Sequence, residues 1–179
     1  MAEFLWIFWS FSLLGWGLER LFAAVTRSPQ RRRRCLLLLP LCPVYGLGMA
    51  AVLALPPSLR SGWPLYLWDG LTATSVEYIY HWWGETFLGV SFWDYTGVFG
   101  NFRGRVCLPF SLAWGLLLFP AVYLVTPPVL ALADRVPVGV TWWLLLAFTA
   151  DAVCSLRFLA VTHDLEALRA VIWPVSADR

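Results

Sequence analysis

Long apolar stretches recur along the chain, and they limit the fold more than any other feature of the sequence. A helix needs about 20 mostly apolar residues to cross the hydrocarbon core of a bilayer, and each stretch has roughly that length. The sequence therefore predicts an all-α fold, a polytopic transmembrane bundle of five helices within residues 1–162, followed by a cytoplasmic tail at 163–179. The predicted spans are 4–25, 35–55, 63–89, 106–125 and 138–161.

The composition supports a membrane environment over a soluble one. Of the 179 residues, 60% are hydrophobic and only 13% are charged, against about 25% charged in soluble domains. A small soluble domain buries only part of its chain and could not hide so much apolar surface. The four cysteines form no C-x-x-C pair, so we interpret them as small buried apolar side chains rather than zinc ligands.

Arginines are unevenly distributed among the loops that join the predicted spans. A dense basic block lies at 27–34, whereas the loops on the opposite side contain only Arg60 and Arg135. Because basic residues accumulate on the cytoplasmic side, we expect the N-terminus outside and the C-terminus inside the plasma (inner) membrane. The block would also attract anionic headgroups, so membrane lipids are expected partners and nucleic acid is not.

Polar or irregular features mark the first two stretches. Glu19 lies near the end of the first, beside Arg20, and either reaches the interface or faces the bundle interior. Prolines and glycines interrupt the second, and broken backbone is tolerated at membrane depth only where protein or a cavity surrounds it. These residues predict either an irregular helix start facing a site or a simple kink: Pro40, Pro43, Tyr45, Gly46 and Gly48.

The third stretch contains Glu77, His81 and Glu85 at intervals of four residues. This spacing places them along one face of a helix, and ionisable groups inside a membrane face the bundle interior because lipid contact is costly. They could relay protons, coordinate a cation or pair with the arginines ahead. Glu-x-x-x-His also matches a metal-ligand spacing, but without another histidine nearby neither a metal site nor a cofactor is predicted.

The segment 90–105 brings further polar residues between the third and fourth spans. Trp93-Asp-Tyr-Thr96 is followed by Asn101-Phe-Arg-Gly-Arg105, with glycines that predict turns. We expect an ion pair of Asp94 with Arg103 or Arg105, either structural or part of a ligand site. The candidate residues of this segment are Asp94, Tyr95, Asn101, Arg103 and Arg105.

Several motifs occur in the order found in a known bacterial family. They are Phe11-Ser-Leu-Leu-Gly-Trp-Gly-Leu-Glu19, Pro40-Leu-Cys-Pro-Val-Tyr-Gly46, Thr74-Ser-Val-Glu-Tyr78, Glu85-Thr-Phe87, Trp93-Asp-Tyr-Thr96, Asn101-Phe-Arg-Gly-Arg105 and Ser111-Leu-Ala-Trp-Gly115. Within residues 1–125 the chain thus resembles the putative ABC-transporter type IV (CmpB-like) membrane proteins, and more distantly animal multi-pass proteins with a Trp-Asp-Tyr-Ser core. It departs from the family at His81, where a small polar residue is usual, and at Thr96, where serine is usual.

The resemblance implies a permease-like transport component with an intramembrane acidic site. The chain has neither lysine nor a G-x-x-x-x-G-K-[ST] motif, so an ATPase would be a separate subunit. A homodimer is the alternative partner, because five helices enclose little space. A membrane-embedded lipid-handling enzyme and a non-catalytic assembly subunit remain open as functions, and no catalytic residue is assigned. We expect Glu77, Glu85, Asp94 and Arg105 to converge on one cavity, with Glu19 and Tyr45 contributing.

Overall fold

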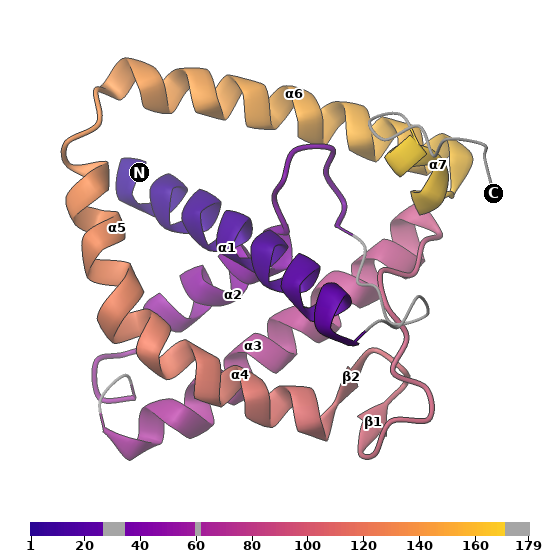
Figure 1. Ribbon diagram of the computed structural model, residues 1–179, viewed down its shortest axis with the longest axis horizontal. Coiled ribbons are helices and arrows are strands. Elements are labelled where there is room, and N and C mark those ends of the chain that lie inside the picture. Colours follow the sequence, from indigo (N-terminus) through magenta and orange to yellow (C-terminus); the bar gives the residue numbers. More distant parts are fainter. Residues whose placement is uncertain (27–34, 60–61, 171–179) are drawn as a thin grey trace.

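The computed structural model is mostly helical and describes residues 1–26, 35–59 and 62–170 (Figure 1). The basic block at 27–34, Arg60 and the end of the tail lie outside the described residues. The elements are α1 (Ala2–Thr26), α2 (Pro43–Leu53), α3 (Trp63–Trp83), the π-helical turn η2 (Gly84–Leu88), β1 (Asn101–Phe102), β2 (Val106–Cys107), α4 (Leu108–Pro120), the π-helical turn η3 (Ala121–Val125), α5 (Thr126–Ala133), α6 (Val138–Thr162) and α7 (Leu165–Ala170).

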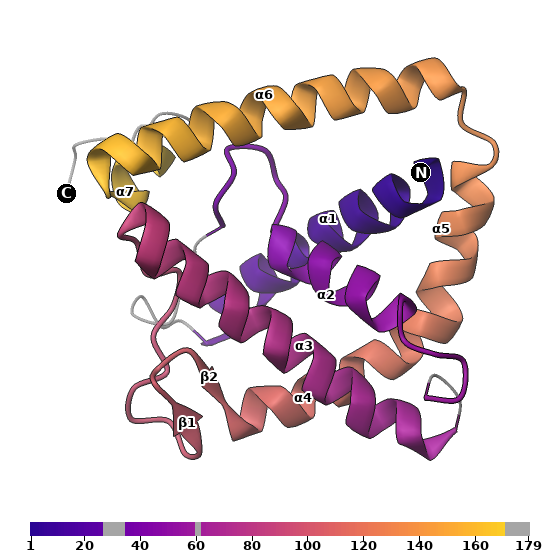
Figure 2. The ribbon, with the colours of Figure 1, turned by 180° about the vertical axis from the view of Figure 1, so that it is seen from behind.

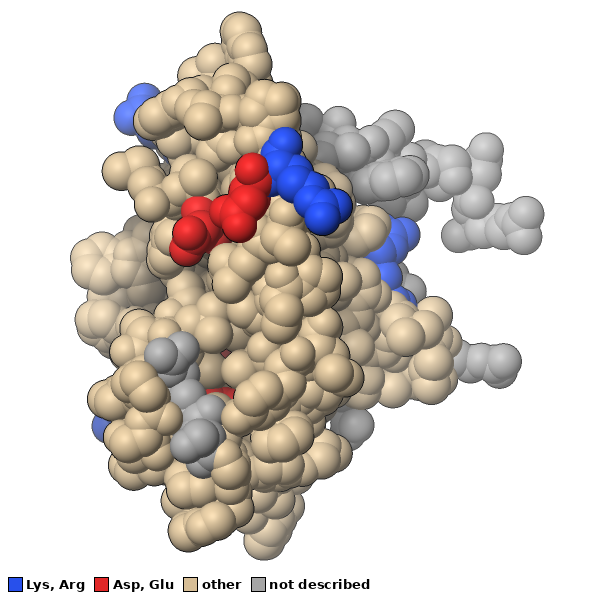
Figure 3. Space-filling model, turned by 90° about the vertical axis from the view of Figure 1, so that its left-hand side faces the viewer, with Lys and Arg blue, Asp and Glu red and all other residues tan. Residues whose placement is uncertain are grey.

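Two of the helices have the length and apolar character of membrane spans. One runs from Leu108 to Ala133 through α4, η3 and α5, and the other is α6. Most of their apolar side chains lie on the outside of the protein, where lipid can solvate them. Figure 3 shows a face on which charged residues occupy only a few places. The total of five spans and their orientation stay predictions.

The second and fourth predicted spans differ from the helices that form. α2 contains 11 residues, or about 16 Å at 1.5 Å per residue, which is too short to cross a bilayer. Residues 35–42 precede it as a non-helical strap, so the irregular start is present and the continuous helix over 35–55 is not. The fourth span does not stop at 125 but continues to Ala133, because the π-helical turn η3 carries the helix past Pro120.

The strap also corrects the interpretation of all four cysteines as small buried apolar side chains. Cys35 and Cys42 form a disulfide, with their Cα atoms 5.1 Å apart, because the strap folds back on itself. Cys107 is free and buried, whereas Cys154 is free and exposed. Disulfides are typical of oxidising compartments, while the adjacent basic block is typical of the cytoplasmic side. The disulfide therefore indicates that the strap lies on the side away from the cytoplasm, whereas the basic block beside it indicates the cytoplasmic side.

Close helix packing places α2 between α1 and α3 (Figure 2). α3 packs against α4 and α2, and α2 packs against α1. A Cβ atom at Gly15 of α1 would overlap the Tyr45 ring of α2, so only glycine allows these helices to come this close. The contact brings Tyr45 beside the turn of α1 that carries Glu19.

Polar contacts attach α6, which is exposed along most of its length, to the rest of the protein (Figure 1). Asp151 accepts hydrogen bonds from the backbone N–H groups of Leu38 (3.1 Å) and Leu39 (2.9 Å) in the strap. At the start of α6, Trp6 Nε1 donates to Thr141 Oγ1 at 3.1 Å. Beyond its end, His163 Nδ1 donates to the Leu88 carbonyl oxygen at 2.6 Å. An apolar helix is thus positioned by a few directional bonds.

Candidate functional site

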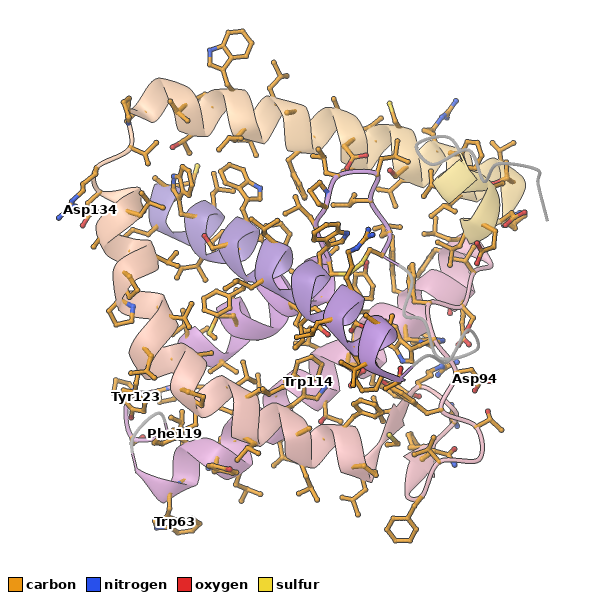
Figure 4. All side chains as sticks on the ribbon, in the orientation of Figure 1. Trp63, Asp94, Trp114, Phe119, Tyr123 and Asp134 are labelled. Atoms are coloured by element: carbon orange, nitrogen blue, oxygen red, sulfur yellow. A yellow bond between two sulfur atoms is a disulfide. The ribbon has the colours of Figure 1, made fainter. Side chains whose placement is uncertain are left out.

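A cavity of about 450 Å³ lies where α1, α2 and α4 meet the segment that follows η2. Figure 4 places Trp114 near the middle of the molecule and Asp94 at the edge beside the hairpin. The lining residues are Leu18, Glu19, Phe22, Tyr45, Trp93, Asp94, Tyr95, Gly97, Val98, Pro109, Phe110, Ala113, Trp114 and Leu117. Four of the ten residues predicted from the sequence are among them: Glu19, Tyr45, Asp94 and Tyr95.

Glu19 and Tyr45 form one wall of the cavity. The Tyr45 hydroxyl donates a short hydrogen bond to a Glu19 carboxylate oxygen. Glu19 is half-buried and faces the bundle rather than extending away from it. Of the two orientations that the sequence left open, the structure has the inward one, because Gly15 lets the Tyr45 ring reach α1.

Glu77 lies outside the cavity lining and holds two of the lining residues in place. Its carboxylate is 1% exposed and accepts hydrogen bonds from the Tyr95 hydroxyl at 3.0 Å and from Trp114 Nε1 at 2.9 Å. Both donors line the cavity. Glu77 therefore connects α3 to the Trp-Asp-Tyr-Thr segment and to α4, and it contributes to the site through these two side chains.

His81, Glu85 and Arg105 form a separate cluster that does not line the cavity. Glu85 Oε2 accepts from Arg105 Nε at 2.7 Å, and Glu85 Oε1 lies 3.1 Å from His81 Nε2. Arg105 also donates to the Tyr78 hydroxyl at 2.9 Å. The pairing with an arginine that the sequence left open is thus formed by Glu85. The cluster fastens the hairpin to the end of α3.

The Trp93-Asp-Tyr-Thr96 segment is held by backbone contacts with the β1–β2 hairpin. Trp93 Nε1 donates to the Arg105 carbonyl oxygen at 2.7 Å, and Tyr95 N donates to the Gly104 carbonyl oxygen at 2.8 Å. Asp94 Oδ1 accepts from Thr96 N at 2.8 Å. The hydrogen bonds from Thr96 hold the pKa of Asp94 below its usual value.

The expected ion pair of Asp94 with an arginine is not formed among the described residues. Arg105 binds Glu85 instead, and the exposed Arg103 guanidinium lies 5.6 Å from the centre of the Phe102 ring. Asn101 serves the turn, with its Nδ2 donating to the Val98 carbonyl oxygen at 3.0 Å. Arg103 and Gly104 both have positive φ, at 55° and 68°, in the tight turn of the hairpin. Asn101, Arg103 and Arg105 therefore lie outside the cavity lining.

Comparison with known protein families identifies the family of the chain. The model of the family described as "Putative ABC-transporter type IV" matches residues 6–156. The chain belongs to this family. The matched region contains every residue of the cavity lining and of the Glu85 cluster. No curated protein and no solved structure matches the chain. Family membership, together with the exposed apolar helices, identifies a membrane protein related to transport.

Within this family member, sequence reasoning missed several residues of the site region. Trp93, Phe110 and Trp114 line the cavity, although aromatic residues are so common in this chain that composition could not single them out. Asp69 was also missed. It is 0% exposed, and neither of its carboxylate oxygens has a hydrogen-bond partner among the described residues. It lies two four-residue steps before Glu77, and extending that period backwards would have found it.

The described residues contain no group of three or more His, Cys, Asp or Glu side chains arranged to hold a metal ion. The Glu85–His81 pair has Arg105 as its third member. Chemically, the cavity offers aromatic surfaces, a tyrosine hydroxyl and carboxylates, whereas the Glu85 cluster offers an ion pair. The cavity lining and the Glu85 cluster therefore offer different chemical groups.

Proposed function

We propose that this protein is a permease-like component of a transport system and that the cavity is its substrate site. The observation that carries the proposal is the 450 Å³ cavity with Glu19 and Asp94 in its lining. Its volume falls within the range of about 300–1,000 Å³ that is usual for small-molecule sites. Side chains from separate helices and from the following segment surround it, so a movement of α1 against α4 would alter access to it.

The other two functions receive less support from the contacts. A lipid-handling enzyme was considered because Arg103 and Arg105 could hold a phosphate headgroup, but Arg105 is bound to Glu85 and Tyr78. Arg103 lies outside the cavity lining. A purely structural subunit would account for the hydrogen bonds of Glu77, yet it would give no use to a cavity that contains carboxylates.

The partner that fits this proposal is a separate ATPase subunit, because the chain has no phosphate-binding loop of its own. The family description is that of an ABC transporter, which supports association with another subunit such as an ATPase. A homodimer is the alternative way to enlarge the pathway beyond the helices of one chain.

The experiment that tests the proposal is solute uptake by proteoliposomes that contain the purified protein. Choline, inorganic phosphate and glycine, each radiolabelled, serve as probes of a cation, an anion and a zwitterion. We expect wild-type protein to admit at least one probe faster than protein-free liposomes do. The variants Glu19→Gln and Glu77→Gln should abolish that uptake, because they change the wall of the cavity and the residue that holds Tyr95 and Trp114 in place.

The matched control is Glu3→Gln, which removes an exposed carboxylate at the start of α1, far along the helix from Glu19. It should take up the probes as the wild type does. Size-exclusion chromatography and thermal unfolding separate loss of function from loss of fold. Full uptake by a folded Glu19→Gln variant would overturn the proposal, and so would absence of uptake for all three probes when the protein is reconstituted together with the ATPase subunit that co-purifies with it.

A further inference from the structure

Asp69 is a buried acidic residue that belongs neither to the cavity lining nor to the Glu85 cluster. It lies in α3 and is 0% exposed, and neither of its carboxylate oxygens has a hydrogen-bond partner among the described residues. Buried polar groups in folded proteins almost always have such a partner, so each exception calls for an explanation. The contacts described so far give none for Asp69.

The elements around α3 offer no positive charge to Asp69. α3 packs mainly against α4, α2, η2 and β2 (Figure 2), and these four described elements contain no Lys, Arg or His. Their titratable side chains are Tyr45, Glu85 and Cys107. Those of α3 itself, besides Asp69, are Tyr66, Glu77, Tyr78, Tyr80 and His81. His81 lies towards the far end of the helix and is paired with Glu85. An ionised Asp69 would therefore have no opposite charge to stabilise it.

The side chains packed on the same face of α3 are apolar. Ala73, one turn after Asp69, belongs to an apolar cluster with Met49 and Val52 of α2 and Leu118 of α4. Met49 and Val52 are themselves 0% exposed. Burial of a charged group without a partner is very costly, and an acid in such surroundings keeps its proton and stays neutral.

Two glycines bring α3 and α4 together next to Asp69. A Cβ atom on Gly70 would lie 3.1 Å from the Ser111 carbonyl oxygen, and one on Gly115 would lie 2.6 Å from the Tyr66 carbonyl oxygen. The absence of side chains at 70 and 115 therefore allows the two helices to approach this closely. Asp69 directly precedes Gly70 and lies about one turn after Tyr66. A separation of α3 from α4 at this point would therefore open a way for water to Asp69.

α4 takes part both in this contact and in the cavity. Ala113, Trp114 and Leu117 line the cavity, while Gly115 of the same helix approaches α3. A movement of α4 that changes access to the cavity therefore also changes the contact beside Asp69. Because coupled equilibria act in both directions, gain or loss of a proton at Asp69 would in turn bias the position of α4.

We propose that Asp69 is a proton-binding site, neutral while α3 and α4 are in contact and ionised when they separate. The exchange is an acid–base step: the O–H bond of the carboxyl group breaks, its electron pair stays on the oxygen, and the proton passes to water. Metal ions such as Mg²⁺ need several oxygen ligands, and the described residues contain no group of side chains arranged to hold one. The inference goes beyond the proposed function, since Asp69 is outside the cavity lining.

The experiment is infrared spectroscopy of the full-length protein in liposomes, which detects the carbonyl stretching band of a protonated carboxyl group. We expect the spectrum of the wild type minus that of Asp69→Asn to contain this band at neutral pH. The band should shift when H₂O is replaced by D₂O, because an exchanging O–H group takes up deuterium. The matched control is Asp134→Asn, which removes an exposed carboxylate at the end of α5 and should leave the band in place.

Three results would overturn the proposal. Absence of the band from the difference spectrum would show that Asp69 is ionised in the folded protein. A band that does not shift in D₂O would show that the carboxyl group is closed off from water and only structural. Loss of the band on addition of Na⁺ or Mg²⁺ at constant pH would show that the site takes a metal ion instead of a proton.

A glycine variant tests the link between the helix contact and the proton. Gly115→Ala places a methyl group against the Tyr66 carbonyl oxygen and should push α4 away from α3. The band of protonated Asp69 should then weaken at neutral pH, and a carboxylate band should replace it. The matched control is Gly48→Ala in α2, where an added Cβ meets nothing within 4 Å. This control should keep the full band of the wild type.

Thermal unfolding verifies that the glycine variants are folded. If Gly115→Ala does not fold, Gly70→Ala takes its place, because its added Cβ lies farther from the opposing backbone, at 3.1 Å. A folded variant of either glycine that keeps the full band would contradict the dependence of the proton on the α3–α4 contact.

The infrared measurements need no transported solute, so they fail independently of the uptake experiment. An exchanging Asp69 band in a protein that takes up none of the probes would reject the transport function and retain the proton site. Uptake that depends on Glu19, without an Asp69 band, would reject the proton site and retain transport.

Discussion

Glu77 and Glu85 occupy the same face of one helical segment, two turns apart, and yet they have different surroundings. Glu77 is 1% exposed and both of its oxygens accept hydrogen bonds from uncharged donors. The Glu85 side chain is 36% exposed and pairs with Arg105. Helical spacing predicted that the two would share a face. Only the tertiary fold buries Glu77 beside the cavity and leaves Glu85 at the surface, where it attaches the hairpin to the end of α3.

Depth changes the energetics of the same chemical group. A buried carboxylate cannot exchange its partners for water, so loss of either side leaves unsatisfied polar groups. A carboxylate at the surface keeps water as an alternative partner, and salt screens its attraction to a base. Substitutions of Glu77 and Glu85 should therefore change the free energy of unfolding by different amounts and with a different dependence on salt. Substitution of the buried Asp69 should change it in the opposite direction.

Replacing Glu77 should have the largest effect. Glu77→Leu leaves the Tyr95 hydroxyl and Trp114 Nε1 without their acceptor, and each unsatisfied buried donor costs about 1–3 kcal/mol. We expect a loss of about 2–5 kcal/mol in the free energy of unfolding, measured in mixed detergent micelles. Glu85→Leu is the comparison and should cost clearly less. Equal losses at the two positions would contradict the distinction between them.

Asp69 should respond with the opposite sign. It is as buried as Glu77, but its carboxylate has no hydrogen-bond partner among the described residues. Replacing a buried unpartnered polar group by an apolar one of similar size removes a desolvation cost. Asp69→Val should raise the free energy of unfolding by about 1 kcal/mol or leave it unchanged. A marked loss, of the size expected for Glu77→Leu, would show that Asp69 has a stabilising partner.

The Glu85–Arg105 pair should contribute little to stability, and its contribution should fall with salt. A double-mutant cycle with Glu85→Gln and Arg105→Gln isolates the coupling between the two side chains. We expect a coupling that is a small fraction of the Glu77 effect and that decreases as the ionic strength rises, because the pair is partly exposed. A large coupling that does not change with salt would place Glu85 in the same class as Glu77.

Asp94 should give the smallest effect and the only one of the four that is set by pH. Its pKa is lowered in the folded protein by the hydrogen bonds from Thr96. The stabilisation is therefore present above the unfolded pKa of about 3.9 and is lost as the pH falls through the lower folded value. The midpoint of thermal unfolding should fall slightly more for the wild type than for Asp94→Asn between neutral pH and about pH 3. Identical pH profiles would mean that the turn at Thr96 contributes nothing.

Local patterns predicted what depends on neighbouring residues. Helical structure, the irregular start of α2, the turns at the glycines and the shared face of Glu77, His81 and Glu85 all follow from spacing over a few positions. The bounds of α2 and of the α4–α5 helix differ from those of the predicted spans, because hydropathy cannot distinguish a short helix with a strap from a full span, or locate a π-helical turn after Pro120. The Cys35–Cys42 disulfide was also missed, since it depends on how the strap folds back.

The sequence by itself determined that this chain belongs in a membrane and that it carries ionisable residues on one face of its third helix. Those are properties of composition and of period, and no tertiary contact is needed to read them. The tertiary structure alone decided which carboxylates meet which partners. Glu19 reaches Tyr45 across the glycine contact of α1 with α2, Glu77 is enclosed by Tyr95 and Trp114, and Arg105 turns to Glu85 rather than Asp94. Distances between residues that lie far apart in the chain are set by the packing of the helices. The cavity forms between these packed helices, so it too depends on the tertiary structure.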